Sequence, residues 1–116
     1  MTHYYSEQPD SPSQERVIDY TFNGLPFQFT SDKGVFSKNH VDEGSKFLLE
    51  SMREHLQGFQ NLDINRYRKL ANGACLDLGC GYGVLGIVSK RLWPGQSWTF
   101  SDVNERALAL TERNAH

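Results

Sequence analysis

The sequence predicts an α/β fold in which two strand–helix units with parallel strands follow a β-hairpin and a helix. Three observations indicate this arrangement. A glycine-rich turn, Gly79–Gly83, joins a short apolar strand to a helix-forming run. Aromatic and β-branched residues alternate on both sides of Asn23-Gly24, which is typical of a hairpin. Between these two features, apolar residues recur at helical spacing over residues 41–59.

The composition is that of one small globular domain. The chain has 116 residues, of which 38% are hydrophobic and 22% are charged. Its 12 basic and 14 acidic side chains give a net charge of −2, which provides no long-range attraction for nucleic acid. The run Arg66–Lys69 is the one candidate for a local basic patch, although such runs usually face the solvent.

Cysteine usage and hydropathy predict a reducing, cytoplasmic setting. Cys75 falls in a strand and Cys80 in the glycine turn, so the pair is too close and too differently placed to suggest a disulfide. Because the spacing of a four-ligand site is also absent, we expect no metal. We expect no contact with a membrane either, since no apolar run approaches the ~18 residues that a spanning helix needs.

The first 60 residues are expected to precede the strand–helix core. Residues 1–15 are polar and rich in turn-forming residues, which predicts an extended N-terminal arm. Residues 16–60 should form the hairpin, a loop and a helix. Asn23-Gly24 predicts a type I′ turn, because both central residues of that turn take positive φ. Pro26 cannot donate a hydrogen bond to a strand ladder, so its strand should be an edge strand.

A loop over residues 30–40 leads into the predicted helix over residues 41–59. Asp42 lies in the first turn of this helix, where the helix dipole favours a negative charge. The loop carries one exposed-looking aromatic residue, Phe36. Residues 61–73 are mixed and polar, which predicts a loop with a short helical turn.

Residues 61–116 are expected to contain the first two strand–helix units of a cofactor-binding domain. The pattern predicts strands at 74–78 and 98–101 and helices at 84–92 and 105–115, the last with Asn104 as its N-cap. A parallel sheet of two strands cannot bury both of its faces, so we expect this chain to be the N-terminal part of a longer domain. The uncovered edge of that sheet would invite self-association.

The glycine turn allows two interpretations. Gly81–Gly86 matches the dinucleotide-binding pattern G-x-G-x-x-G, but that register would place Asp77 and Gly79 inside the strand. In the alternative register Asp77 ends the strand and faces the ligand crevice, where a carboxylate favours a ligand with cationic or donor-rich groups, such as S-adenosylmethionine. Asp102 ends the next strand and could accept hydrogen bonds from ribose hydroxyls in either case. A structural role for Asp77, capping the amides of the turn, stays open.

Asp77–Gly83 resembles the first motif of class I methyltransferases that depend on S-adenosylmethionine. Gly34–Ser37, Asp42–Ser45 and Ser101–Ala107 narrow the resemblance to the "methyltransferase small domain" family, which includes enzymes that methylate guanine N2 in small-subunit ribosomal RNA. The resemblance spans nearly the whole chain. It implies the N-terminal part of a Rossmann-like fold and an S-adenosyl-L-methionine cofactor.

The resemblance also implies roles for individual residues. The turn would lie under the methionine and ribose of the cofactor, Asp77 would hold the amino-acid end, and Asp102 would hold the ribose. Val103 would pack on the adenine, while Phe36 and Ser37 would close over the cofactor with Asp42 nearby; a plain core role for Phe36 is the alternative. The implied cofactor-binding residues are Asp77, Gly79, Cys80, Gly81, Gly83, Asp102, Val103, Phe36 and Ser37.

The acceptor half of such an enzyme has no counterpart in this sequence. In the family an Asn-Pro-Pro motif after the fourth strand holds the substrate amine, and no Asn-Pro-Pro occurs here. We therefore assign no catalytic residue and expect the chain alone to be inactive, although its parent would methylate a guanine amine of ribosomal RNA. Two alternatives are a non-catalytic cofactor-binding module and the NAD-binding half of an oxidoreductase.

Overall fold

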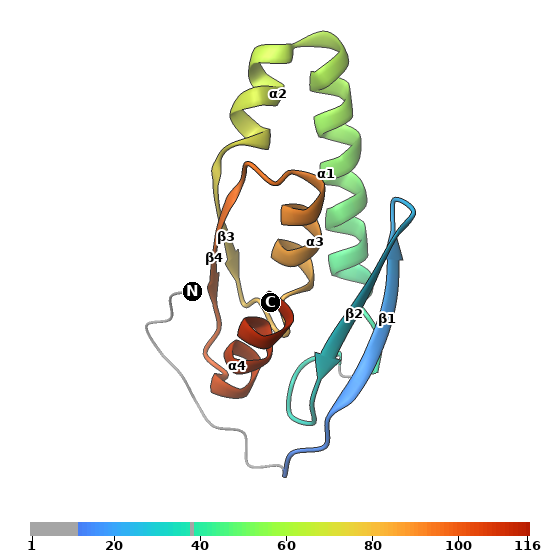
Figure 1. The fold of residues 1–116 in the computed structure, drawn as a ribbon, viewed down its shortest axis with the longest axis vertical. Coiled ribbons are helices and arrows are strands. Elements are labelled where there is room, and N and C mark those ends of the chain that lie inside the picture. Colours follow the sequence, from blue (N-terminus) through green and yellow to red (C-terminus); the bar gives the residue numbers. More distant parts are fainter. Residues whose placement is uncertain (1–11, 38) are drawn as a thin grey trace.

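The computed structural model describes residues 12–37 and 39–116, and its elements follow the predicted α/β order. The hairpin consists of β1 (Arg16–Phe22) and β2 (Leu25–Ser31), and the helices α1 (Glu43–Leu62) and α2 (Ile64–Ala71) follow it. The two strand–helix units are β3 (Ala74–Leu78) with α3 (Val84–Leu92), and β4 (Ser97–Ser101) with α4 (Glu105–Asn114). Figure 1 shows α1 and α2 extending together beyond the body formed by the other elements.

The hairpin forms as the sequence predicts. β1 pairs antiparallel with β2, from Arg16 opposite Ser31 to Phe22 opposite Leu25. Asn23 and Gly24 have φ angles of 51° and 76°, so both take the positive values that a type I′ turn requires. Because the sheet has only these two strands among the described residues, the strand that contains Pro26 is an edge strand there, as expected.

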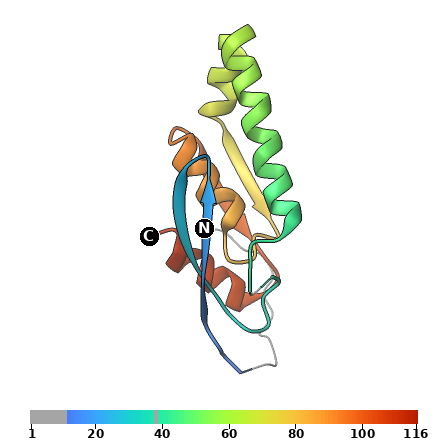
Figure 2. The same ribbon diagram turned by 90° about the vertical axis from the view of Figure 1, so that its right-hand side faces the viewer.

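The hairpin packs on the strand–helix core through its apolar face. Figure 2 shows it crossing in front of α3 and α4. The main cluster of buried side chains combines residues from the hairpin, the loop after it, α1, the glycine turn, α3 and α4. Its members are Ile18, Phe22, Phe29, Val35, Val41, Leu49, Tyr82, Val84, Val88, Ala107 and Leu110. Asn114 adds a polar clamp, since its side chain exchanges hydrogen bonds of 2.8 and 3.0 Å with the backbone of Thr30.

β3 and β4 form a parallel two-stranded sheet that α3 covers on one face. The register runs from Ala74 beside Ser97 to Leu78 beside Ser101. Because side chains alternate along a strand, Asp77 lies on the opposite face from Leu76 and Leu78, which are 58% and 67% exposed. The face of the sheet that carries Leu76 and Leu78 is therefore exposed. Self-association through the edge of the sheet stays a prediction.

Residues 61–73 contain more helix than the predicted loop with a short helical turn. The structure has helix α2 there, capped by Asp63, whose Oδ1 accepts a hydrogen bond from Arg66 N at 3.2 Å. Ala71 and the partly buried Tyr67 pack with Leu56 and Trp93. The helix is therefore specified by long-range packing on Trp93, which a local pattern of polar residues does not reveal.

Three further expectations concern the N-terminal arm, membrane-spanning helices and metal ligands. Residues 12–15 of the predicted arm have no regular structure, and residues 1–11 lie outside the described part of the chain. Among the described residues, no helix is long and apolar enough to cross a membrane, and no group of three or more His, Cys, Asp or Glu could hold a metal ion. The cytoplasmic setting stays a prediction.

Gly86→Ala should destabilise the protein by about 1–3 kcal/mol, because a Cβ atom there would lie 2.4 Å from Cε1 of Phe100. Gly58→Ala is the matched control: it also lies in a helix, and its Cβ would meet nothing within 4 Å. The control should stabilise the protein by about 0.5–1 kcal/mol through helix propensity. Urea unfolding of both variants measures the difference, and equal stabilisation would contradict the close approach of α3 to the sheet.

Candidate cofactor site at the glycine turn

The parallel pairing of β3 and β4 places the glycine turn beside the end of β4. The backbone amides of Gly79 and Cys80 both donate to the carbonyl oxygen of Ser101, at 2.7 and 3.0 Å. The next residue, Asp102, turns its carboxylate toward the turn, and its Oδ2 accepts from Gly81 N at 2.9 Å. The two strand ends therefore form one corner, as expected for the ligand edge of a parallel sheet.

The glycines of this region serve two different purposes. Gly79 and Gly81 have φ angles of +70° and +59°, and a Cβ atom on either would meet no atom within 4 Å. They therefore keep the turn open toward a ligand. Gly83, with φ +99°, permits close packing instead, because its Cβ would lie 2.8 Å from Cδ1 of Ile87.

A cavity of about 390 Å³ opens above Gly79 and Gly81. Its volume lies in the range typical of small-molecule sites, about 300–1,000 Å³. Its walls come from the loop after β2, the start of α1, the glycine turn, the end of β4 and the start of α4. The lining residues are Gly34, Val35, Phe36, Asp42, Ser45, Gly79, Cys80, Gly81, Tyr82, Val84, Asp102, Asn104 and Ala107.

The cavity contains five of the nine predicted site residues. Phe36, Gly79, Cys80, Gly81 and Asp102 line it. The four that do not line it are Asp77, Gly83, Ser37 and Val103. Their predicted contacts with a cofactor stay predictions.

The walls of the cavity are acidic. Asp42 and Asp102 line it, and none of the described lining residues is Lys, Arg or His. Asp42 also caps α1, since it accepts hydrogen bonds from N and Oγ of Ser45 at 3.0 and 2.7 Å. Such a cavity attracts a cationic ligand and disfavours a phosphate.

Asp77 lies behind the turn, buried between β3 and α3. It is 5% exposed, and its Oδ2 accepts a hydrogen bond from Gly86 N at 3.3 Å. Burial, against the hydrogen bond from Gly86 and with a contribution from the nearby charge of Asp102, raises the pKa of this carboxyl to about 6. The first turn of α3 thus already faces a carboxylate, where a dinucleotide site would offer its amides to pyrophosphate. Asp77 therefore bonds an amide of α3, whereas the structural role left open for it was to cap the amides of the glycine turn.

The loop between β2 and α1 forms the outer wall. Phe36 is 77% exposed, so the alternative of a core role for it is wrong. Ser37 has φ 56°, and its carbonyl oxygen accepts a hydrogen bond of 3.0 Å from the hydroxyl of Tyr82. The carbonyl oxygen of His40 lies 3.1 Å from the same hydroxyl. Tyr82, which follows Gly81, therefore ties this loop to the glycine turn.

Cys80 contributes an uncharged thiol to the cavity lining. Its Sγ lies 3.4 Å from Oγ1 of Thr111, which donates to the carbonyl oxygen of Gly81 at 2.8 Å. Burial raises the pKa of the Cys80 thiol to about 11, so the group stays protonated at neutral pH. A protonated thiol can pack against a ligand and is a poor nucleophile.

A second hollow, of about 1040 Å³, lies away from the glycine turn between the hairpin, α3 and the edge of β4. Aromatic and aliphatic side chains such as Phe27, Ile87 and Trp98 line much of it. Although it is larger, it has neither the open glycines nor the paired carboxylates. We therefore assign the candidate site to the smaller cavity.

A family model described as methyltransferase small domain matches residues 26–116, which is most of the chain. The chain belongs to the methyltransferase small domain family. The family predicted from the glycine turn and its neighbouring segments is thereby confirmed.

Two relatives of this family member are longer than the chain itself. The uncharacterized protein YbxB of Bacillus subtilis is 37% identical over 113 residues, covering 97% of this chain and 49% of that protein. The ribosomal RNA small subunit methyltransferase C of Pseudomonas entomophila is 40% identical over 86 residues, covering 74% of this chain and 21% of that protein. The chain spans about half the length of the first and about a fifth of the second.

A solved structure confirms the predicted methyltransferase fold. The 16S rRNA N2 G1207 methyltransferase of T. thermophilus, solved in complex with AdoMet and guanosine, superimposes with a TM-score of 0.70 at 27% identity. The match covers 91% of this chain and 26% of that enzyme. AdoMet is S-adenosylmethionine, the cofactor that the sequence predicts.

Sequence reasoning did not include several cavity residues of this family member. Asn104 was expected only as an N-cap, and it fills that role while also lining the cavity. Ser45 was not assigned to the site; its N and Oγ donate to Asp42, which the resemblance puts near the cofactor. No sequence signal identifies Tyr82, because its partners Ser37 and His40 are far away along the chain.

Asp77→Asn should raise the free energy of unfolding by about 3 kcal/mol at pH 7.5, because the pKa of Asp77 rises from 3.8 to about 6 on folding. Above pH 6 the folded protein carries an unfavourable buried charge, which asparagine removes while keeping an acceptor for Gly86 N. As the pH falls through 6 toward 4, wild-type Asp77 takes up its proton and the difference between the two proteins should vanish.

Denaturant unfolding at pH 7.5, 5 and 4 measures this difference. Asp19→Asn is the control, since Asp19 lies exposed on β1 with a hydrogen bond to Gln28. A stability gain for Asp77→Asn that did not change with pH would contradict the buried charge.

Proposed function

We propose that the cavity at the glycine turn binds S-adenosylmethionine and that the protein supplies the cofactor half of a methyltransferase site. The observation that carries this proposal is the charge of the site. Asp42 and Asp102 line the cavity, Asp77 faces the first turn of α3, and no described lining residue is basic. S-Adenosylmethionine carries an ammonium and a sulfonium group and no phosphate, so its charge complements these carboxylates.

The residues present fit this cofactor. Gly79 and Gly81 leave open space above the turn, and the carboxylate of Asp102 lies at the corner where a ribose could donate its hydroxyl protons. Val103 is 51% exposed beside Asp102, which leaves its side chain available for the adenine. Phe36 and Ser37 come from the outer loop that would close over the ligand. Asp77 would act on the amino-acid end at longer range, through its charge or through water.

When bound, S-adenosylmethionine supplies an activated methyl group for direct attack by a nucleophilic nitrogen. The residues of this chain would orient the cofactor, shield it and balance its positive charge, which are the contributions expected of a site that works by alignment and electrostatics. The acceptor would be a guanine exocyclic amine of small-subunit ribosomal RNA. The names of the P. entomophila and T. thermophilus relatives support this assignment.

The second part of the proposal concerns where the acceptor amine is held. No Asn-Pro-Pro occurs in the sequence, and the chain spans half or less of its relatives' lengths. We therefore place the acceptor site outside these 116 residues and expect no turnover from them alone. A non-catalytic cofactor-binding module would share the same cavity and differ only in the activity of the complete protein.

Titration calorimetry should detect binding of S-adenosylmethionine and S-adenosylhomocysteine, with no comparable binding of NAD. Asp102→Asn should weaken both ligands roughly 10- to 100-fold, since a hydrogen bond to a charged group contributes about 1.5–3 kcal/mol. Asp19→Asn removes the same charge from the exposed hairpin and should leave both affinities unchanged. Tighter binding of NAD than of S-adenosylmethionine would overturn the proposal.

Methyl transfer from labelled S-adenosylmethionine to small-subunit ribosomal RNA should be undetectable with this chain alone. The reason is that the sequence contains no Asn-Pro-Pro motif to hold the acceptor amine. Scintillation counting of the recovered RNA checks this, with a full-length relative as the positive control. Labelled guanine in the reaction of the chain alone would show that the acceptor site is not missing.

A further inference from the structure

We propose that Asp32 is a positioning residue that holds the loop of residues 33–37 in place as the outer wall of the cofactor cavity. The inference rests on the proposed function of that cavity. Asp32 does not line the cavity itself, and it belongs to none of the motifs that identify the family. Its effect would come through the backbone that it organises.

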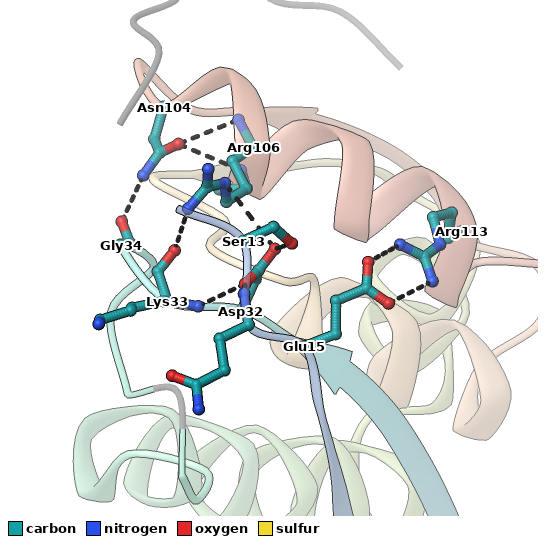
Figure 3. A network of polar contacts seen from close by, with 10 residues as sticks. Ser13, Glu15, Asp32, Lys33, Gly34, Asn104, Arg106 and Arg113 are labelled. Atoms are coloured by element: carbon teal, nitrogen blue, oxygen red, sulfur yellow. Dashed lines mark hydrogen bonds and ion pairs between the residues drawn. The ribbon is translucent and has the colours of Figure 1, made fainter. Parts of the chain in front are cut away.

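The carboxylate of Asp32 joins three segments that are far apart in the sequence (Figure 3). It follows β2 directly and is only 3% exposed. Its oxygens accept hydrogen bonds from Ser13 Oγ at 2.7 Å, from Gln14 N at 2.5 Å and from Lys33 N at 2.7 Å. Nε of Arg106, on α4, lies 3.8 Å from its Oδ2.

The first turn of α4 holds the same loop from the other side. Nη1 of Arg106 donates to the carbonyl oxygen of Lys33 at 2.5 Å, and Nδ2 of Asn104 donates to that of Gly34 at 2.8 Å. Gly34 and Asn104 both line the cavity, so these contacts join two of its walls. Asp32 is thus the anionic centre of a connection between the loop and the start of α4.

The charge of Asp32 is stable at neutral pH. Burial alone would raise the pKa of its carboxyl, but the hydrogen bonds from Ser13, Gln14 and Lys33, together with the charge of Arg106, outweigh burial and lower it. The ionised form is the one that can accept all of these bonds.

The loop is therefore anchored at both ends with its apolar tip outside. Asp32 holds one end, where its carbonyl oxygen also accepts from Val35 N at 3.2 Å, and Tyr82 holds the carbonyl oxygen of Ser37 at the other. Phe36 lies between these anchors and is 77% exposed. An exposed aromatic side chain on a fixed backbone can contact a bound cofactor with little loss of backbone entropy.

Asp32→Asn tests the inference, with Glu15→Gln as its matched control. Glu15 ties the same N-terminal segment to α4 through Arg113, at 2.6 and 3.1 Å, but does not touch the loop. Asp32→Asn should weaken S-adenosylhomocysteine binding by roughly fivefold or more and speed amide hydrogen exchange in residues 33–37, with exchange in β3 and α3 unchanged. Glu15→Gln should leave both the affinity and the loop exchange at wild-type values.

If Asp32→Asn does not fold, Arg106→Gln replaces it, and the same local exchange and loss of affinity should follow. Affinity within twofold of wild type, or faster exchange spread evenly over the whole chain, would overturn the positioning role. The wild-type titration separates the two proposals. If the wild type binds neither S-adenosylmethionine nor S-adenosylhomocysteine, the proposed function fails and this inference fails with it, whereas wild-type binding with unaffected variants defeats the inference alone.

Discussion

The pairing of β3 with β4 is the interaction on which the candidate site depends. Because the strands are parallel and in register to Leu78 and Ser101, the turn after one strand meets the residue after the other. One carbonyl oxygen, that of Ser101, accepts from two amides of the glycine turn and holds the turn against Asp102. The open glycines and the cavity above them follow from this contact, because a turn displaced along β4 would no longer face the start of α4.

Three carboxylates lie in or near the candidate site. Asp77 lies under the turn, Asp102 lies beside it, and Asp42 lies across the cavity at the start of α1. Each also satisfies backbone amides of the protein: Asp77 bonds Gly86, Asp102 bonds Gly81 and Asn104, and Asp42 bonds Ser45. Asp102 and Asp42 therefore organise the backbone and also set the charge of the cavity, whereas Asp77 lies outside its lining.

Local chemistry explains which parts of the structure could be predicted. The Asn23-Gly24 turn and the Asn104 cap are decided by neighbouring residues, so the sequence pattern was sufficient for both. Only a short helical turn was predicted where α2 lies, because the local pattern does not show its packing with Trp93. The role of Asp32 was invisible because its partners Ser13 and Arg106 come from distant segments. Asp77 was predicted to hold a ligand, yet it accepts a hydrogen bond from Gly86 within the fold. The packing of α3 against β3 decides which way this carboxylate turns, and the local sequence does not show that packing.

The clamp made by Asn114 has a consequence for how the protein folds during synthesis. Its side chain bonds Thr30 on β2 and donates to the carbonyl oxygen of Tyr82 at 2.8 Å, so the hairpin gains these partners only from the last residue of α4. The hairpin leaves the ribosome early, but the bonds from Asn114 can form only after residue 114 has been synthesised. Such non-local contacts slow folding, and a nascent chain would meanwhile expose the apolar face of the hairpin to chaperones.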